Sequence, residues 1–294
     1  MADVLAVFDR KVVRQRWDRS AVRFGEHDFL FREVAERLLD RLDDITRAFP
    51  LALDLGCQGG VLAETLAGRG GIETLVQCEL SEALARRAAA AAVGQGSRHT
   101  TLTVVADEEG LPFAPATFDL ILSNMTLHWV NDLPGALIQA RCALKPDGLF
   151  LATLLGAGTL TELRGVLAQA EIDSEGGLSP RVSPFADVRD GAHLLQRAGF
   201  VLPVADVDRI TVSYPDLSRL VADLRGTGAT NALLERRKTF TRSTTLAAAA
   251  ALYQERFAGP DGRIPATFEV ITLTGWTSGK STGRGNPEEE STRA

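Results

Sequence analysis

The stretch Leu53-Asp54-Leu55-Gly56-Cys57-Gln58-Gly59-Gly60 decides the fold of this chain. It continues a short apolar run that begins after Pro50, and it leads into residues 61–66, whose pattern predicts a helix. Glycines let the backbone approach a ligand closely and adopt positive φ, while the N-terminus of a helix offers unpaired N–H groups. A strand, a glycine-rich turn and a helix in this order therefore predict a site for a nucleotide-type cofactor.

On both sides of the turn, strand and helix patterns alternate over residues 50–155. The predicted strands are 51–55, 74–79, 101–105, 118–123 and 149–155, the helices include 82–93 and 133–144, and a turn is expected at Lys145-Pro146-Asp147-Gly148. Such alternation is typical of a parallel sheet that is covered by helices on both faces. Ligands bind such sheets at the carboxyl ends of the strands.

The pattern changes after residue 155. We expect helices at 159–170, 187–198, 215–226, 229–237 and 243–257, and strands at 204–214 and 266–274. The fold class is therefore α/β, a Rossmann-like, mostly parallel sheet of seven strands with N-terminal helices and a helical insertion near the C-terminus. The expected organisation is an N-terminal helical segment (1–48), a core (49–214), a helical insertion or lid (215–258), a final core strand (259–277) and a disordered tail (278–294).

Composition excludes several classes of protein. The chain has 294 residues, 45% of them hydrophobic, and its 32 Lys and Arg against 38 Asp and Glu give a net charge of −6. This balance argues against a nucleic-acid partner, and no apolar run is long enough to predict a membrane span. The three cysteines lack a C-x-x-C spacing and are expected to be buried, reduced thiols. The scattered histidines form no pattern typical of a metal site.

Three acids lie at or just after the ends of successive predicted strands: Asp54, Glu79 and Asp107. Neighbouring strands place these ends side by side along one cleft. A carboxylate is a pure acceptor that can take two hydroxyl groups at once. Glu79 is therefore suited to a ribose diol, and Asp107 is suited to the exocyclic amine of adenine.

The glycine turn, the acid after the second strand and the stretch Asp107-Glu108-Glu109-Gly110-Leu111-Pro112-Phe113 together resemble class I S-adenosylmethionine (SAM)-dependent methyltransferases. The resemblance implies SAM as cofactor, with contacts from Asp54, Leu55, Gly56, Cys57, Gly60, Glu79, Leu80, Asp107, Glu108 and Asn124. NAD is disfavoured because its G-x-G-x-x-G fingerprint is absent. One departure is Gln58, which stands where the family usually has glycine and whose Cβ resists positive φ.

His128 follows the fourth predicted strand, where substrate and methyl donor meet in this fold. It is a candidate general base, because imidazole can take a proton from an acceptor group. A structural histidine packed beside Trp129 is the alternative. No other catalytic residue is predicted.

A narrower resemblance covers nearly the whole chain. The stretches that carry it include Val7-Phe8-Asp9-Arg10, Phe49-Pro50-Leu51-Ala52-Leu53-Asp54-Leu55-Gly56-Cys57, Leu127-His128-Trp129-Val130-Asn131-Asp132-Leu133-Pro134, Glu175-Gly176-Gly177 and Ile264-Pro265-Ala266-Thr267-Phe268. They resemble the mitochondrial respiratory complex I assembly factor five family, whose known member is linked to hydroxylation of an arginine on a complex I subunit. The resemblance implies a protein substrate in complex I, peripheral association with that membrane complex, and a cytoplasmic location, or the matrix side of a mitochondrion in a eukaryote.

Two other functions stay open. The malonyl-carrier-protein O-methyltransferase of biotin synthesis shares the cofactor motifs and the Leu127-His128-Trp129 stretch, but it is less similar over residues 156–268. A non-catalytic, SAM-sensing assembly chaperone is the third hypothesis. Methyl transfer from a sulfonium depends mostly on alignment, so the residues indicate the cofactor better than the reaction.

Overall fold

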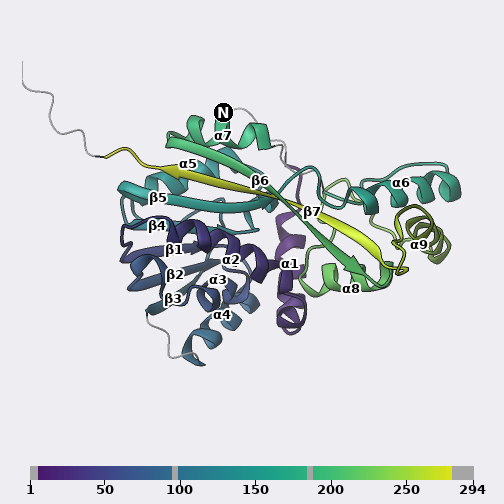
Figure 1. Ribbon diagram of the computed structural model, residues 1–294, viewed down its shortest axis with the longest axis horizontal. Helices are drawn as coiled ribbons and strands as arrows, with labels where there is room; N and C mark the ends of the chain where they lie inside the picture. Colours follow the sequence, from purple (N-terminus) through teal and green to yellow (C-terminus); the bar gives the residue numbers. More distant parts are fainter. Residues whose placement is uncertain (1–5, 95–98, 184–187, 280–294) are drawn as a thin grey trace, which may run out of the picture.

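The computed structural model describes residues 6–94, 99–183 and 188–279, which contain a seven-stranded sheet (Figure 1). The strands are β1 (Leu51–Leu55), β2 (Thr74–Glu79), β3 (Thr100–Val105), β4 (Phe118–Asn124), β5 (Leu144–Leu155), β6 (Val201–Tyr214) and β7 (Ile264–Trp276). Their order is β3-β2-β1-β4-β5-β7-β6, with β1 to β5 parallel and β7 antiparallel to both of its neighbours. The predicted mostly parallel, seven-stranded α/β fold is confirmed.

Helices flank this sheet along its whole length. The α-helices are α1 (Arg10–Ser20), α2 (Phe29–Asp43), α3 (Val61–Thr65), α4 (Glu82–Gly94), α5 (Leu133–Ala143), α6 (Thr161–Glu175), α7 (Val188–Ala198), α8 (Leu217–Gly226) and α9 (Ser243–Phe257), and the 3₁₀ turns are η1 (Phe24–Glu26), η2 (Gln58–Gly60), η3 (Arg69–Gly71) and η4 (Leu127–Trp129). Asp9 caps α1 by accepting a hydrogen bond from the Val12 N–H at 3.2 Å.

The sheet has a hydrophobic core on each face. Alternate residues of β1 point to opposite faces, so that Ala52 joins the core with α2, α3 and α4, whereas Leu53 joins the core with α5 and α7. Because both faces are covered, the central strands consist of nearly unbroken apolar residues.

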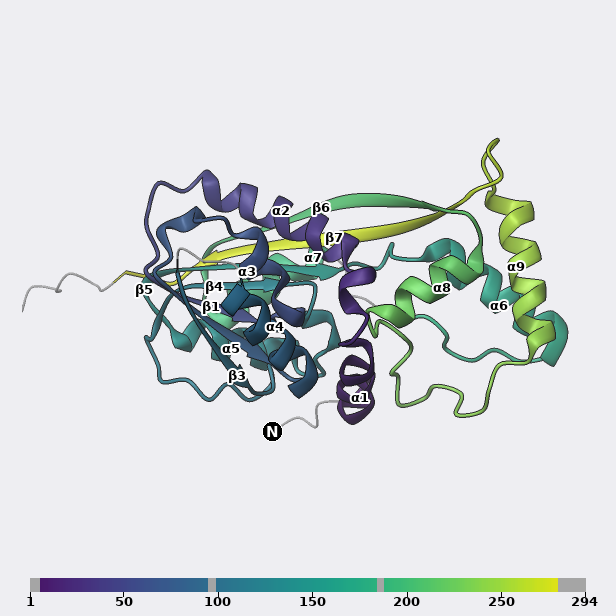
Figure 2. The same ribbon diagram turned by 90° about the horizontal axis from the view of Figure 1, so that it is seen from below.

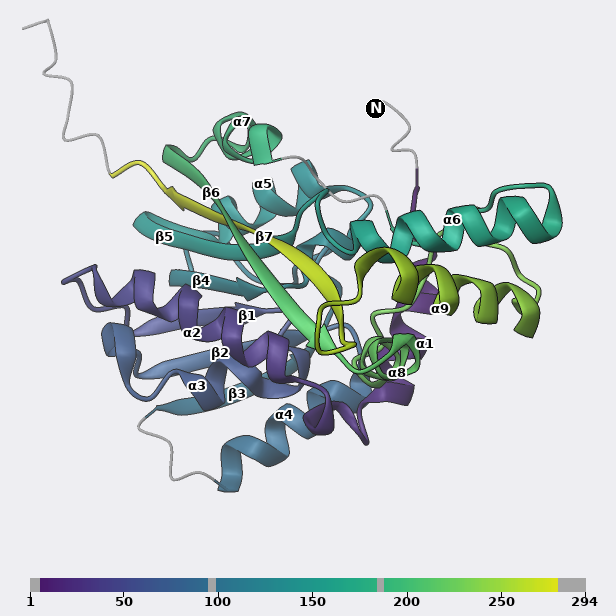
Figure 3. The same ribbon diagram turned by 45° about the vertical axis from the view of Figure 1, so that its right-hand side comes forward.

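The C-terminal half builds a second lobe. The long strands β6 and β7 run past the parallel strands towards α8 and α9 (Figure 1), and α1 stands between the sheet and the lobe formed by α6, α8 and α9 (Figure 2). Helices α6 and α9 lie side by side in this lobe (Figure 3). The carboxyl ends of the parallel strands therefore face α1 and the lobe.

One predicted helix is wrong. Residues 229–237 are irregular, because Leu233 forms an isolated β-bridge with Phe8 near the N-terminus. The Asn231 side chain accepts from the Leu233 N–H at 3.1 Å, and the Arg236 guanidinium donates to the Leu233 carbonyl at 2.7 Å. These local and long-range hydrogen bonds occupy backbone N–H and carbonyl groups that would otherwise pair within a short helix.

Smaller differences concern boundaries and exposure. The expected turn at residues 145–148 is part of β5, which opposes β4 with an irregular register. Cys142 is exposed on α5 rather than buried, whereas Cys57 and Cys78 are buried. The predicted tail lies outside the described residues from 280 onward. Within the three described ranges, every helix is too short or too polar to cross a bilayer.

Candidate functional site

The glycine turn after β1 forms a tight backbone loop. Gly56 has a φ of 72°, and a Cβ there would lie 2.2 Å from the Thr126 side chain. The Gly56 and Cys57 N–H groups both donate to the Cys78 carbonyl, at 2.8 and 3.1 Å. Gln58 also adopts a positive φ of 44°, as do the two glycines after it. A residue with a Cβ therefore occupies a left-handed position for which glycine is best suited.

Two fully buried carboxyl groups lie beside this turn. Neither oxygen of Asp54 has a hydrogen-bond partner among the described residues, and burial raises the Asp54 pKa to about 7. The carboxylate of Glu79 accepts hydrogen bonds from the N–H groups of Gln58, at 2.9 Å, and Ser81, at 3.0 Å. Burial, and then the neighbouring charge of Glu108, raise the Glu79 pKa to about 8. Burial therefore favours the protonated form of both carboxyl groups over the charged form.

The acids after β3 are paired with a cation from α1. Arg10 donates to Asp107 Oδ1 at 2.6 Å and also to the Glu108 carboxylate. Glu108 is fully buried, and burial raises its pKa although Arg10 opposes this rise. The first turn of α1 thus covers the acid that the sequence assigns to adenine.

Several acceptor atoms at this edge of the sheet are unsatisfied. Both Asp54 carboxyl oxygens, Gln58 Oε1 and Glu108 Oε1 are buried and make no hydrogen bond to any described residue. Folded proteins leave few buried acceptors in this state, because each one costs the free energy of its lost hydration. A ligand that brings hydrogen-bond donors would complete this set.

The other predicted cofactor residues lie at or just after the ends of β1, β2 and β4, with different surroundings. Leu55, Cys57 and Leu80 are buried, and burial raises the pKa of the Cys57 thiol. Asn124 is engaged in the protein itself, since its amide donates to the Phe31 carbonyl at 2.9 Å and accepts from Thr153 Oγ1 at 3.0 Å. Asn124 therefore ties β4 to α2 and β5.

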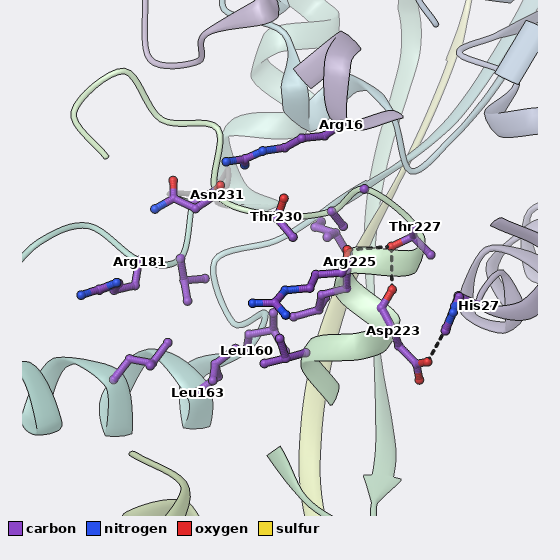
Figure 4. A pocket seen from close by; sticks show the side chains of 18 of the residues that line it. Arg16, His27, Leu160, Leu163, Arg181, Asp223, Arg225, Thr227, Thr230 and Asn231 are labelled. Atoms are coloured by element: carbon purple, nitrogen blue, oxygen red, sulfur yellow. Dashed lines mark hydrogen bonds and ion pairs between the residues drawn. The ribbon is translucent and has the colours of Figure 1, made fainter. Parts of the chain in front are cut away.

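A cavity of about 930 Å³ opens next to this edge, between α1, α6, α8 and the irregular segment 227–241 (Figure 4). His128 and Trp129 line it at the end of β4. Burial lowers the His128 pKa to about 3, so the imidazole is neutral at physiological pH. His128 stays a candidate general base, with a structural role beside Trp129 as the alternative. In the described part of the chain, no group of three or more His, Cys, Asp or Glu side chains could hold a metal ion.

Sequence reasoning missed the closest partner of the predicted acids. Arg10 lies in the predicted N-terminal helical segment, but its pairing with Asp107 and Glu108 is not predicted. The available signal is the stretch Val7-Phe8-Asp9-Arg10, which belongs to the family resemblance. The arginines that line the cavity are also scattered along the sequence and share no local pattern.

Comparison with known proteins agrees with this geometry. Residues 53–152 match the model of a methyltransferase domain. The human protein named arginine-hydroxylase NDUFAF5, mitochondrial, is 42% identical over 95% of this chain and 79% of its own length. The malonyl-[acyl-carrier protein] O-methyltransferase of Halorhodospira halophila is 34% identical over 96% of this chain and 92% of its own length.

The fold is shared with enzymes of low sequence identity. A solved structure of Haemonchus contortus phosphoethanolamine N-methyltransferase 2 in complex with S-adenosyl-L-methionine is 15% identical and superposes with a TM-score of 0.57, covering 90% of this chain and 60% of that one. This likeness shows the fold, and the near full-length similarity to NDUFAF5 shows the family. The chain therefore belongs to the complex I assembly factor five (NDUFAF5) family, whose members are enzymes built on the class I SAM-dependent methyltransferase fold.

Proposed function

We propose that this enzyme binds SAM at the carboxyl ends of β1–β3 and modifies an arginine of a respiratory complex I subunit during assembly of the complex. The observation that carries the proposal is the 42% identity to a protein named arginine-hydroxylase over 95% of this chain. Similarity of this extent includes the C-terminal lobe as well as the core.

The buried acceptors beside the glycine turn support SAM as the cofactor. SAM brings an ammonium group, two ribose hydroxyls and an adenine amine, all of which donate hydrogen bonds. Asp54 and the turn would hold the methionine part, Glu79 the ribose, and the Asp107–Glu108 segment the adenine. The N–H groups of Gln58 and Ser81 orient the Glu79 carboxylate and leave lone pairs for ribose hydroxyls.

The residues of this chain bind and orient the ligands. When bound, SAM supplies an electrophilic methyl group on a cationic sulfur. Helix α1 shields the site, because Arg10 covers the acids after β3 and Asp18 accepts from Ser81 Oγ at 2.6 Å beside β2. Insertion of oxygen into an arginine would need an oxidant from outside the chain. We therefore propose which type of residue is modified, and leave the chemistry of the modification to the experiment.

The domain boundaries and the site of action belong to the same proposal. Residues 49–214 and 259–277 would form the cofactor-binding core, while 1–48 and 215–258 would cover the substrate side. The relatives named NDUFAF5 are described as mitochondrial. We infer that this enzyme works where complex I is assembled, in the bacterial cytoplasm or on the matrix side of a mitochondrion, in peripheral contact with the membrane complex.

Peptide mass spectrometry on complex I from cells with and without the gene tests the proposal. We expect a modification on one arginine that is lost in the deletion strain, and an oxygen-sized mass would indicate hydroxylation. Complementation with Glu79→Gln should fail to restore it, whereas Glu82→Gln, an exposed change on α4, should restore it. A methyl-sized mass would instead indicate transfer chemistry on the same subunit. An unmodified subunit in both strains would contradict the proposal.

O-methylation of a carrier-bound carboxylic acid is the second candidate. It is favoured by the 34% identity to a malonyl-[acyl-carrier protein] O-methyltransferase over 92% of that enzyme. Rescue of a biotin auxotroph that lacks this methyltransferase, together with methyl transfer to a malonyl thioester by the purified protein, would support it. Failure of both assays would leave arginine modification as the proposal.

A further inference from the structure

The cavity beside the cofactor edge is large enough for a small molecule. Its volume of about 930 Å³ lies within the range of ligand sites, and its floor includes Met125, His128 and Trp129 at the end of β4. Met125 on this floor precedes Thr126, whose hydroxyl donates to the Gly56 carbonyl at 2.9 Å. The cavity therefore adjoins the predicted cofactor site without including its carboxyl groups.

The wall of the cavity is strongly cationic. Among the described residues that line it, seven are Arg or Lys and one, Asp223, is acidic. Asp223 is itself engaged, because His27 Nδ1 lies 2.7 Å from its carboxylate and both side chains are buried. The wall therefore offers no carboxylate to a cationic ligand and an excess of donors to an anionic one.

The seven cations differ in their pairing. Arg181 is 2.6 Å from Glu171, Arg237 pairs with Glu175, and Arg236 lies 3.4 Å from Asp9. The remaining four have no ion pair with any residue in the described ranges: Arg16, Arg19, Arg225 and Lys238.

Arg16 is the most constrained of these four cations. Its Nη1 is buried without a hydrogen-bond partner in the described part of the chain. Burial, and then the neighbouring Arg236 and Arg19, lower its pKa. Figure 4 shows Arg16 reaching into the cavity beside Asn231, with Arg225 projecting into the same space from α8.

The opposite wall is apolar. Leu160 and Leu163 project into the cavity from the start of α6 (Figure 4), and Phe268 of β7 and Leu217 of α8 continue the same surface. Burial of an apolar chain against such side chains is favourable by about 25 cal/mol per Å². The cavity thus combines a cationic side with an apolar side.

We propose that this cavity binds an amphipathic anion, a molecule with a carboxylate or phosphate group on an apolar body, and that Arg16 and Arg225 hold the anionic group. The inference goes beyond the proposed function, because a substrate arginine would meet like charges here.

Binding of octyl compounds to the full-length protein tests the proposal without turnover. Calorimetry and tryptophan fluorescence, to which Trp129 in the cavity contributes, would be recorded with octanoate, octyl phosphate, octanol and octylammonium. We expect the anions to bind at least tenfold more tightly than octanol, and octylammonium not to bind. The better of the two anions identifies the head group. Octanoate should also exceed acetate, since acetate lacks the apolar body. Equal binding of octanol and the anions would overturn the proposal.

Substitutions of Arg16 and Arg14 on α1 provide a matched pair, and substitution of Arg225 on α8 is a second test. Arg16→Gln and Arg225→Gln should each weaken anion binding about tenfold or more, whereas Arg14→Gln, an exposed change on the same helix, should leave it unchanged. Thermal unfolding monitors the fold, and Arg16→Gln should not lower Tm because its buried Nη1 makes no hydrogen bond. Equal losses for the variants at 14 and 16 would mean general surface attraction and would refute the site. Arginine modification is read separately by mass spectrometry, so the two proposals can fail independently.

Discussion

The carboxyl edge of β1–β3 and the cavity beside it lie under the same helix but have opposite charge. At the edge, the buried carboxyl groups of Asp54, Glu79 and Glu108 are near one guanidinium, that of Arg10. In the cavity, seven cationic side chains surround one acid among the described lining residues. The difference suggests that each site is complementary to a different ligand: a sulfonium and ammonium compound at the edge, and an anion in the cavity.

Helix α1 separates the two sites because its arginines point in different directions. Arg10, in the first turn, pairs with Asp107 and Glu108, while Arg16 lines the cavity. An amphipathic helix of this kind is ordinarily placed by its apolar face, here by Val13 and Trp17. Changes to the charged residues of either site can therefore test the comparison without removing the helix from the core.

The largest expected effect follows removal of the cation from the acidic edge. Arg10→Ala should lower the free energy of unfolding by about 3 kcal/mol, because the buried Glu108 loses its partner. Urea unfolding measures the loss. Arg23→Ala is the control, since its pair with Glu26 is exposed and should contribute little. Similar losses for both variants would show that the edge does not depend on Arg10.

Cofactor affinity should respond next. Glu79→Gln should weaken SAM binding by about 1–3 kcal/mol, which is the scale for leaving a buried hydrogen-bonding group without its partner. Isothermal calorimetry with SAM measures the change, and Glu82→Gln on the exposed face of α4 is the control. Unchanged affinity in the Glu79 variant would mean that the cofactor does not use this acid.

The pH dependence of stability should differ once a buried acid is removed. Asp54 and Glu79 keep their protons in the folded chain up to about pH 7 and 8, whereas unfolded carboxyl groups ionise near pH 4. The folded state therefore binds more protons over pH 4–8, so these groups make stability fall as pH rises through this window. Asp54→Asn should reduce that fall by up to about 1.4 kcal/mol per pH unit.

Urea unfolding of the wild type and of Asp54→Asn at several pH values between 5 and 8 measures this difference. Asp44→Asn is a suitable control, because Asp44 is exposed at the end of α2. If the two variants show the same pH profile as the wild type, the Asp54 carboxyl group ionises normally. Its surroundings would then stabilise the charged carboxylate despite its burial.

The smallest effect is expected at the turn itself. Gln58→Gly should raise the free energy of unfolding by about 1 kcal/mol, because a non-glycine residue at a φ of 44° is strained. Thermal unfolding measures the gain. Gly59→Ala should have the opposite effect, since its φ is 73° and a Cβ would lie 2.9 Å from Arg87. A less stable Gln58→Gly protein would show that the Gln58 side chain contributes more than the backbone strain costs.

The sequence predicts the core better than the lobe. Strands β1 and β2 coincide with the predicted ranges. A short apolar run between two turns is typical of a strand in a sheet that is covered on both faces. The segment 229–237 is predicted as a helix and is irregular, because Leu233 forms a β-bridge with Phe8 near the N-terminus. Local pattern fails where distant contacts outweigh helix propensity.

By itself, the sequence determined the order of strands and helices, the glycine turn after β1, and the position of acids at successive strand ends, since these depend on neighbours along the chain. Only the tertiary structure decided what surrounds those acids. Arg10 reaches Asp107 across 97 residues and Glu108 across 98. The cationic cavity likewise collects arginines from α1, α8 and the 227–241 segment. Charge complementarity depends on distance in space, and the packing of α1 against the sheet and the lobe sets those distances.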